Sequence, residues 1–263
     1  MNIIACIKQV PASSEVDVDP DTGVLIRDGS NVKMNPYDLY ALEAAFEIKE
    51  SFAGCVINAV TMGPPSAKKV LEEAMAMGAD RATLITDRAF AGADVLATSY
   101  TLSQLIEHIG GYDLVICGKQ TTDGDTAQVG PEMAEFLDIP HIPYVTDIQA
   151  ITDEHIIAKS SFDGHDEISK VMLPCLLTID KGHRVPRLPS FIRKRVMKDV
   201  NIESVKLSDL KDDNPRHYGL NGSPTQVEKV FPPDKTRESK IIHGTKEEAA
   251  DAIVSLLKER KFL

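Results

Sequence analysis

The stretch from Asp113 to Asp138 joins an apolar run, a small polar segment and a helical pattern, in that order. Leu114 to Cys117 has the length and composition of a buried strand, and apolar residues recur at helical spacing from Met133 onward. Pro131 lacks an N–H and is tolerated only in the first turn of a helix, so we expect the helix to begin at about residue 127 to 130. The polar segment between strand and helix holds the residue types that could do chemistry.

Backbone N–H groups in the first turn of a helix have no partner inside the helix, and the helix dipole is positive at that end. At the carboxyl end of a strand, such groups can bind an anion such as a pyrophosphate. Gly118, Gly124 and Gly130 would let a ligand approach the backbone closely. The polar side chains that could contact it are Thr121, Thr122, Asp123, Asp125, Thr126 and Gln128. The local pattern fits a nucleotide cradle or an ordinary turn equally well, because short glycine-rich matches have many false positives.

Composition limits the classes of function. The chain has 263 residues, 43% hydrophobic and 26% charged, which is typical of a globular protein with a full core. Its net charge of −11 argues against general nucleic-acid binding. No apolar run approaches the roughly 20 residues that span a bilayer, and the N-terminus has no basic lead-in, so we expect a cytoplasmic protein without membrane insertion. The four cysteines lack Cys-x-x-Cys or zinc spacing and are expected to be buried thiols: Cys6, Cys55, Cys117 and Cys175.

Short apolar runs alternate with helical patterns along the first half of the chain. Strands are expected at 2–7, 56–60, 81–86 and 114–117, and a hairpin at 16–26. Helices are expected to open at Asn35-Pro36, at Ser66 and at Asp94. This alternation predicts a doubly wound, Rossmann-like parallel α/β sheet. Ligands bind beyond the carboxyl ends of the strands in such sheets, so the segments after Ile7, Val60 and Cys117 are candidate sites.

The pattern changes after Pro140. Strand-like pieces at 142–151, 155–160, 167–173 and 175–179 predict antiparallel hairpins that extend the sheet. Regular periodicity is then lost from Asp180 to Thr245, which predicts an extended arm. Thr245 and Glu248 form a capping box that predicts a final helix.

A basic cluster stands out in this acidic chain, and its members are Lys181, Arg184, Arg187, Arg193, Lys194, Arg195 and Lys198. It is interrupted by Leu188, Pro189, Phe191 and Ile192. Charge runs are most often solvated loops. The better interpretation is a loop that docks a protein, because apolar anchors ringed by Arg are typical of interface hot spots.

Five motifs together resemble the β subunit of electron transfer flavoproteins. They occur in family order along nearly the whole chain, at 6–10 (CIKQV), 34–38 (MNPYD), 74–80 (AMAMGAD), 118–120 (GKQ) and 184–189 (RVPRLP). The resemblance implies a nucleotide site formed by Cys6, Asn35, Pro36, Tyr37, Asp38, Met62, Gly118, Lys119, Gln120, Thr121, Thr122, Asp123, Gly124, Asp125, Thr126, Ala127, Gln128 and Val129. No catalytic side chain and no metal site is expected, because the cofactor performs the redox chemistry.

The resemblance also implies partners. A dehydrogenase recognition loop with Leu188 as its anchor falls on Arg187, Leu188, Pro189, Phe191, Ile192 and Arg193. The final helix would pack on the flavin domain of an α subunit. The implied division is a nucleotide-binding α/β domain at 1–185, an arm with the recognition loop at 186–236, and the docking helix at 237–263.

The cradle from Thr121 to Pro131 resembles the flavin-bifurcating members of anaerobes, which hold FAD in this subunit. That implies hydride transfer from NADH within the αβ complex, then electron flow to ferredoxin or flavodoxin and, through the α-subunit FAD, to an acyl-CoA dehydrogenase. The alternative is a simple carrier that holds a structural AMP here. A third interpretation is a nucleotide-sensing adaptor without redox function.

Overall fold

The computed structural model describes residues 1–12, 31–182, 184–196, 202–228 and 241–263. It forms two compact units, Met1–Gln226 and Val227–Leu263. The hairpin expected at 16–26 lies outside the described residues. The finer division expected from the sequence, with boundaries after residues 185 and 236, stays a prediction.

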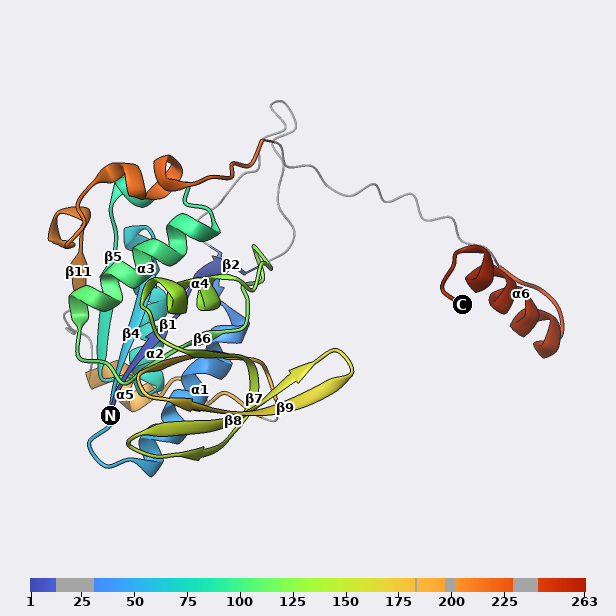
Figure 1. Ribbon diagram of the computed structural model, residues 1–263, viewed down its shortest axis with the longest axis horizontal. Helices are drawn as coiled ribbons and strands as arrows, with labels where there is room; N and C mark the ends of the chain where they lie inside the picture. The colour runs from blue at the N-terminus through green and yellow to red at the C-terminus, as the bar shows by residue number, and fades with distance from the viewer. Residues whose placement is uncertain (13–30, 183, 197–201, 229–240) are drawn as a thin grey trace. The chain divides into compact units, whose positions relative to one another are not determined.

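The first unit contains a nine-stranded sheet flanked by helices (Figure 1). Its strands, in sheet order, are β11 (Glu203–Val205), β5 (Arg81–Ile85), β4 (Val56–Met62), β1 (Asn2–Cys6), β6 (Leu114–Gly118), β10 (Cys175–Ile179), β7 (His141–Ile151), β8 (His155–Phe162) and β9 (His165–Met172). Every pair from β11 to β7 is parallel, and β7, β8 and β9 pair antiparallel. The doubly wound sheet with an antiparallel extension is therefore confirmed.

Helices cover both faces of the sheet. Its two faces carry separate apolar cores because successive strand residues point to opposite sides. In β1, Ile3 and Ala5 pack with α1 (Pro36–Ser51) and α2 (Lys68–Met77), whereas Ile4 and Cys6 pack with the other pair. That second pair is α3 (Val95–Ile109) and α4 (Val129–Phe136). Central strands buried on both sides account for the continuous apolar runs of the sequence.

Helix boundaries follow their local signals. Pro36 is the first residue of α1, and the Asp94 carboxylate accepts the backbone N–H of Ala97 at the start of α3. The helix predicted near Pro131 begins at Val129, inside the expected window. The four cysteines are buried and free. None of the described helices is long and apolar enough to cross a membrane.

Three parts of the topology differ from expectation. The run Cys175–Ile179 was expected in a hairpin, but β10 inserts between β6 and β7 and pairs parallel to both. The stretch after Asp180 was expected to lack regular structure, yet β11 adds an edge strand and α5 (Phe191–Val196) forms a short helix. A two-stranded ribbon of β2 (Gln9–Pro11) and β3 (Val32–Met34) also went unpredicted. Short 3₁₀ helices occupy Pro65–Ala67, Arg88–Phe90, Leu207–Asp209, Pro215–His217 and Gly219–Gly222.

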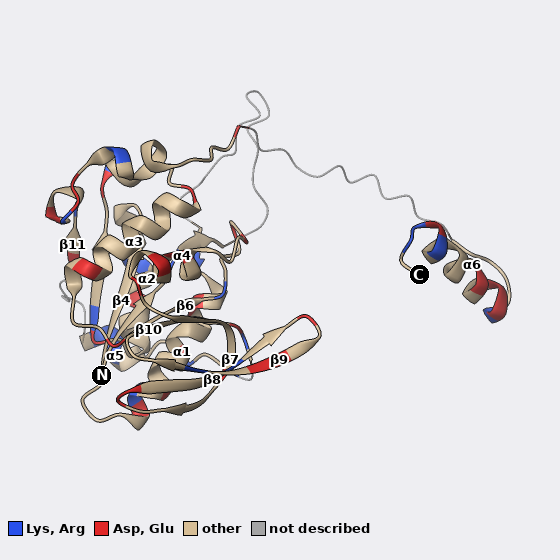
Figure 2. Cartoon of the chain, viewed as in Figure 1, with Lys and Arg blue, Asp and Glu red and all other residues tan. Residues whose placement is uncertain are grey.

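The second unit contains α6 (Lys246–Glu259), which begins at the predicted capping box. The Thr245 hydroxyl accepts the backbone N–H of Glu248, and the Glu248 carboxylate accepts that of Thr245. Acidic residues occupy its first turn and Lys258 its last, which complements the helix dipole (Figure 2). No residue of α6 is buried.

Candidate functional site: the carboxyl edge of the sheet at β1 and β6

The strand order reverses between β1 and β6, which are parallel neighbours with Cys6 opposite Cys117. From β1 the chain passes through α1 to β4 on one side, whereas β6 lies on the other side. In open α/β sheets, the crevice beyond the strand ends at such a reversal is the usual ligand site. The residues placed there follow directly after the two strands, and they include Lys8 and the loop that begins at Gly118.

The first turn of α1 is tied to both strand ends by its side chains. Asn35 occupies the N-cap position but makes no capping hydrogen bond. Its amide nitrogen instead donates to Asp38 Oδ1 at 2.9 Å and to the carbonyl of Gln120 at 2.8 Å. Its side-chain oxygen, Oδ1, accepts the backbone N–H of Thr122 at 3.2 Å. The side chain of Asn35 therefore fixes the loop after β6 by hydrogen bonds, a role that its N-cap position in the sequence did not reveal.

Asp38 is the central buried carboxyl of the site. Its Oδ2 accepts the backbone N–H of Lys8 at 2.7 Å, which links α1 to the end of β1. Burial raises the pKa of the Asp38 carboxyl to about 7, although hydrogen bonds from Asn35, Lys8 and Gly118 act in the opposite direction. Burial, followed by the charge of Asp38, raises the pKa of the Cys6 thiol to about 12, so Cys6 remains a neutral thiol.

The loop after β6 passes very close to α1. A Cβ at Gly118 would clash with the Asp38 carboxylate and would lie 2.7 Å from the carbonyl carbon of Tyr37. Asp125 and Ala127 have left-handed backbones, with φ of 54° and 56°. This conformation is uncommon outside glycine and occurs preferentially at binding loops.

Ion pairs and side-chain hydrogen bonds hold the same loop. Lys8 Nζ lies 2.8 Å from Asp123 Oδ1, and Gln120 donates to Asp125 Oδ1 at 2.6 Å. Although burial alone would raise it, the bond to Lys8 holds the pKa of the Asp123 carboxyl below its ordinary value. Lys8 was not among the predicted site residues, although it lies two residues after β1, in a segment that the strand-end rule selects.

The loop is exposed to solvent in its middle and leads into the start of α4. Residues 122–126 are exposed. The N–H groups of Val129 and Gly130 lie in the first turn of α4 and have no acceptor within that helix, and Pro131 has no N–H at all. Exposed hydroxyls, unpaired amides and the positive end of a helix dipole together match the phosphate groups of a nucleotide. The residues present therefore fit a nucleotide cofactor.

A second polar group extends this edge toward β10 and β7. Lys119 Nζ lies 3.0 Å from Asp180 Oδ2, and 4.8 Å from the ring centroid of Tyr144. Tyr144 has a left-handed φ of 54°. Although burial opposes it, the bond to Asp180 raises the pKa of Lys119. Sequence reasoning missed Asp180 and Tyr144, because only the insertion of β10 between β6 and β7 brings them beside Lys119.

The remaining predicted site residues lie around this centre. Met62 ends β4, the other neighbour of β1, and its side chain packs partly into the core under α3 and α4. Pro36 and Tyr37 form the first turn of α1. Of the predicted docking residues, Arg187 bonds to α1 and Arg193 bonds to the end of α2.

The chain is similar to a known protein family over most of its length. The electron transfer flavoprotein domain model matches residues 22–210, which is more than half of the chain. The chain belongs to the family of electron transfer flavoprotein β subunits. It is 46% identical to the electron transfer flavoprotein subunit beta of Thermoanaerobacterium thermosaccharolyticum, with 99% of both chains covered. It is 43% identical, over the whole of both chains, to the corresponding subunit of Clostridium acetobutylicum and to the caffeyl-CoA reductase-Etf complex subunit CarD of Acetobacterium woodii.

Membership of the electron transfer flavoprotein family confirms the resemblance drawn from the five motifs and makes this chain an electron-transfer subunit. Because the relatives cover both compact units, the family relationship extends over the C-terminal helix as well. The individual site residues stay predictions.

Proposed function

We propose that this β subunit pairs with an α subunit in the cytoplasm, binds FAD at the β1–β6 edge and accepts hydride from NADH. Electrons then pass to ferredoxin or flavodoxin and, through the α-subunit FAD, to an acyl-CoA dehydrogenase. The observation that carries the proposal is the loop 121–128, exposed at residues 122–126, which leads into the first turn of α4 at the strand-order reversal. Its small and polar residues favour a ligand larger than AMP in this proposal.

Each part of the edge has its own task in this proposal. The first-turn amides of α4 and the hydroxyls of Thr122 and Thr126 would bind phosphate oxygens. Asn35 and Asp38 keep the loop at a fixed height above the strands. The bound flavin would supply hydride acceptance and one-electron transfer, so the protein contributes position and electrostatics.

The name of one relative supports the proposed partners. CarD is named as a subunit of a caffeyl-CoA reductase-Etf complex, in which an Etf works with an enzyme of acyl-CoA substrates. At 43% identity over the full length, a similar assembly is the natural expectation for this chain.

The surface proposed for the dehydrogenase is the docking segment, which we define as Arg184–Val196. Its apolar side chains point into solvent, with Leu188 88%, Phe191 78% and Ile192 74% exposed. Exposed apolar groups grouped this way are typical of protein-binding surfaces. The short helix α5, which carries Phe191 and Ile192, also carries three basic residues: Arg193, Lys194 and Arg195. Lys and Arg are blue in Figure 2.

Replacement of the anchor tests the docking assignment. We expect Leu188→Ala to raise the KM of the acyl-CoA dehydrogenase for the αβ complex on the order of tenfold, because the side chain would lose its buried contact area in the complex. Flavin content should not change, because the Leu188 side chain is solvent-exposed and is not part of the proposed cofactor site. Unchanged electron transfer to the dehydrogenase would remove the assignment.

Steady-state kinetics test the redox proposal. The purified αβ complex, mixed with its dehydrogenase, should oxidise NADH only when an enoyl-CoA acceptor and ferredoxin are both present. Reduction of ferredoxin should match reduction of the enoyl-CoA to the acyl-CoA in a fixed ratio. If NADH oxidation does not occur, the subunit is a simple electron carrier.

A further inference from the structure

The side chains of the docking segment divide into two sets. Leu188, Phe191 and Ile192 are exposed, whereas Arg184, Arg187 and Arg193 turn back toward the protein and bond to it. The sequence had suggested that arginines around apolar anchors touch the partner directly. In the structure these three arginines are occupied by intramolecular contacts.

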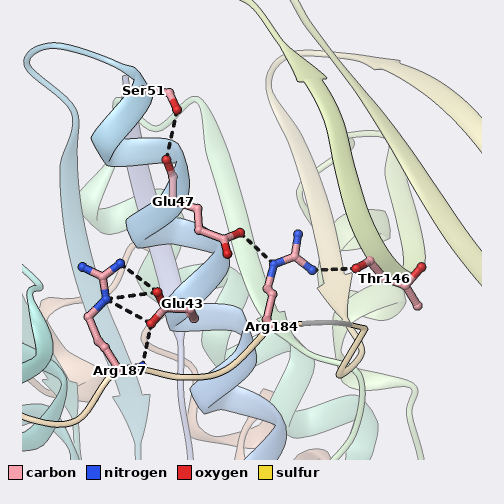
Figure 3. Close-up of polar contacts among 6 residues, drawn as sticks. All are labelled: Glu43, Glu47, Ser51, Thr146, Arg184 and Arg187. Atoms are coloured by element: carbon pink, nitrogen blue, oxygen red, sulfur yellow. Dashed lines mark hydrogen bonds and ion pairs between the residues drawn. The ribbon is translucent and has the colours of Figure 1, made fainter.

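Arg187 is held by the middle of α1 (Figure 3). Its Nη2 lies 2.7 Å from Glu43 Oε1, its Nε bonds both oxygens of the same carboxylate, and its backbone N–H donates to Oε2 at 2.8 Å. Its Nη1 also lies 3.0 Å from Glu50, and its guanidinium lies 4.7 Å from the ring centroid of Phe46. The Glu43 side chain is only 10% exposed and the Arg187 side chain 33%, so the carboxylate side of this forked pair is shielded from water.

Arg184 is fixed one turn along the same helix. Its Nε lies 3.0 Å from Glu47 Oε2, and its Nη1 donates to the carbonyl of Thr146 in β7 at 2.9 Å (Figure 3). Its side chain is 1% exposed. The start of the docking segment is therefore tied to α1 and to the sheet at once.

The far end of the segment is tied to α2. Arg193 donates to the carbonyls of Met75 at 3.1 Å and Ala79 at 2.9 Å, and the backbone N–H of Ser190 donates to the carbonyl of Ala76 at 2.9 Å. Carbonyls at a helix C-terminus lack partners within the helix and carry its negative dipole end. A guanidinium there satisfies both requirements.

These bonds hold a segment that buries none of its apolar anchors. Without them, the chain between the fixed points could sample many conformations, and a partner would have to order it on binding. We propose that Glu43, Arg187 and Arg193 are positioning residues that keep the docking segment in its partner-binding conformation before the partner arrives. This inference rests on the proposed docking function, because it assigns the arginines a role in holding the surface rather than in touching the partner.

The same helix carries both functional regions. α1 begins with Asn35 and Asp38 at the nucleotide edge and continues without interruption to Glu43, Glu47 and Glu50. A continuous helix is stiff, so α1 sets the separation between the cofactor site and the docking segment.

The test uses Glu43→Gln in the complete αβ complex, because it keeps the side-chain size and removes the charge of the fork. We expect hydrogen–deuterium exchange of peptides covering 184–196 to become faster by about tenfold or more. We also expect the KM of the dehydrogenase for the complex to rise on the order of tenfold, with kcat unchanged, because only the ordering cost of binding increases. Glu72→Gln, the same change at an exposed residue of α2, is the matched control and should alter neither quantity.

Two further variants make the result decisive. Arg187→Lys keeps the positive charge but loses the bidentate contact with Glu43, so it should raise both the exchange rate and KM by a smaller amount. It also allows the test to be made if Glu43→Gln does not fold. In a Leu188→Ala background, Glu43→Gln should raise KM much less than it does alone, because both act on the same contact.

The outcomes separate the two proposals. If Leu188→Ala leaves KM unchanged, the docking function is wrong. The exchange rates of 184–196 in Glu43→Gln would still show whether the Glu43–Arg187 pair orders the segment. If Leu188→Ala raises KM but Glu43→Gln leaves either exchange or KM unchanged, the positioning role is overturned.

Discussion

At the scale of single residues, the site depends on a close approach between the end of β6 and the first turn of α1. Only glycine fits at position 118, where the loop passes Asp38 and Tyr37, because any Cβ there would overlap them. Asp38 in turn receives hydrogen bonds from Asn35 and Lys8. A change at Gly118 is therefore transmitted to the whole group.

We expect Gly118→Ala to lower the free energy of unfolding by about 1–3 kcal/mol, because the added methyl group must displace backbone as well as side chain. Nucleotide content of the αβ complex should fall with it. Gly124→Ala in the same loop is the control, since its Cβ would meet only the Thr121 hydroxyl at 3.3 Å. Thermal unfolding of both variants checks the difference, and equal melting temperatures would contradict the close contact.

Asp38 should make stability depend on pH. The folded pKa of about 7 lies above the ordinary value of 3.8, so the folded state keeps a proton that the unfolded chain has lost between these values. The stability contributed by the protonated carboxyl is fully present below pH 3.8. It is lost as pH rises from there toward 7, by about 1.4 kcal/mol per pH unit.

Asp38→Asn should remove this dependence. Denaturant unfolding at pH 5 and pH 8 would compare the variant with the wild type, which should lose stability relative to the variant at the higher pH. A stability difference that stays constant with pH would show that Asp38 does not titrate in this range.

At this scale the sequence located positions better than roles. Residues at the predicted strand ends do meet at one edge, because the carboxyl ends of parallel strands must. The bracing role of Asn35 and the pairing of Lys8 with Asp123 depend on how closely two segments far apart in the chain approach. No local pattern encodes that distance.

At the scale of elements, periodicity identified the amphipathic helices and the buried strands of the first half of the chain. It did not identify the place of β10, because four short strands in succession fit a meander as well as an inserted parallel strand. β11 has only three residues, which is too short to show an alternation. The partner of a strand is decided by tertiary packing, and a single sequence records it only indirectly.

Helix α6 provides a prediction at this scale. An isolated helix of this length is marginal in water, so its capping box should matter. We expect Thr245→Ala to destabilise the helix by about 1 kcal/mol and to speed hydrogen–deuterium exchange over 246–252.

Ser255→Ala is the matched control, because it places a good helix former inside α6 and touches no cap. It should slow exchange or leave it unchanged. Unchanged exchange over 246–252 in Thr245→Ala would mean that the cap does not stabilise α6.

At the scale of the whole molecule, each compact unit has its own proposed task. Met1–Gln226 holds the nucleotide edge at the first turn of α1 and the docking segment along the rest of that helix, and Val227–Leu263 carries an exposed helix that we propose packs on the α subunit. The family relationship covers both units. The proposed chemistry belongs to the assembled complex, since this chain would provide one cofactor site and the α subunit the other.

The central claim is that the β1–β6 edge holds FAD, and the cofactors of the αβ complex test it most directly. We would denature the purified complex and quantify the released FAD and AMP against protein by chromatography. We expect two FAD per heterodimer and no AMP. One FAD and one AMP per heterodimer would contradict it and would make this subunit a simple electron carrier.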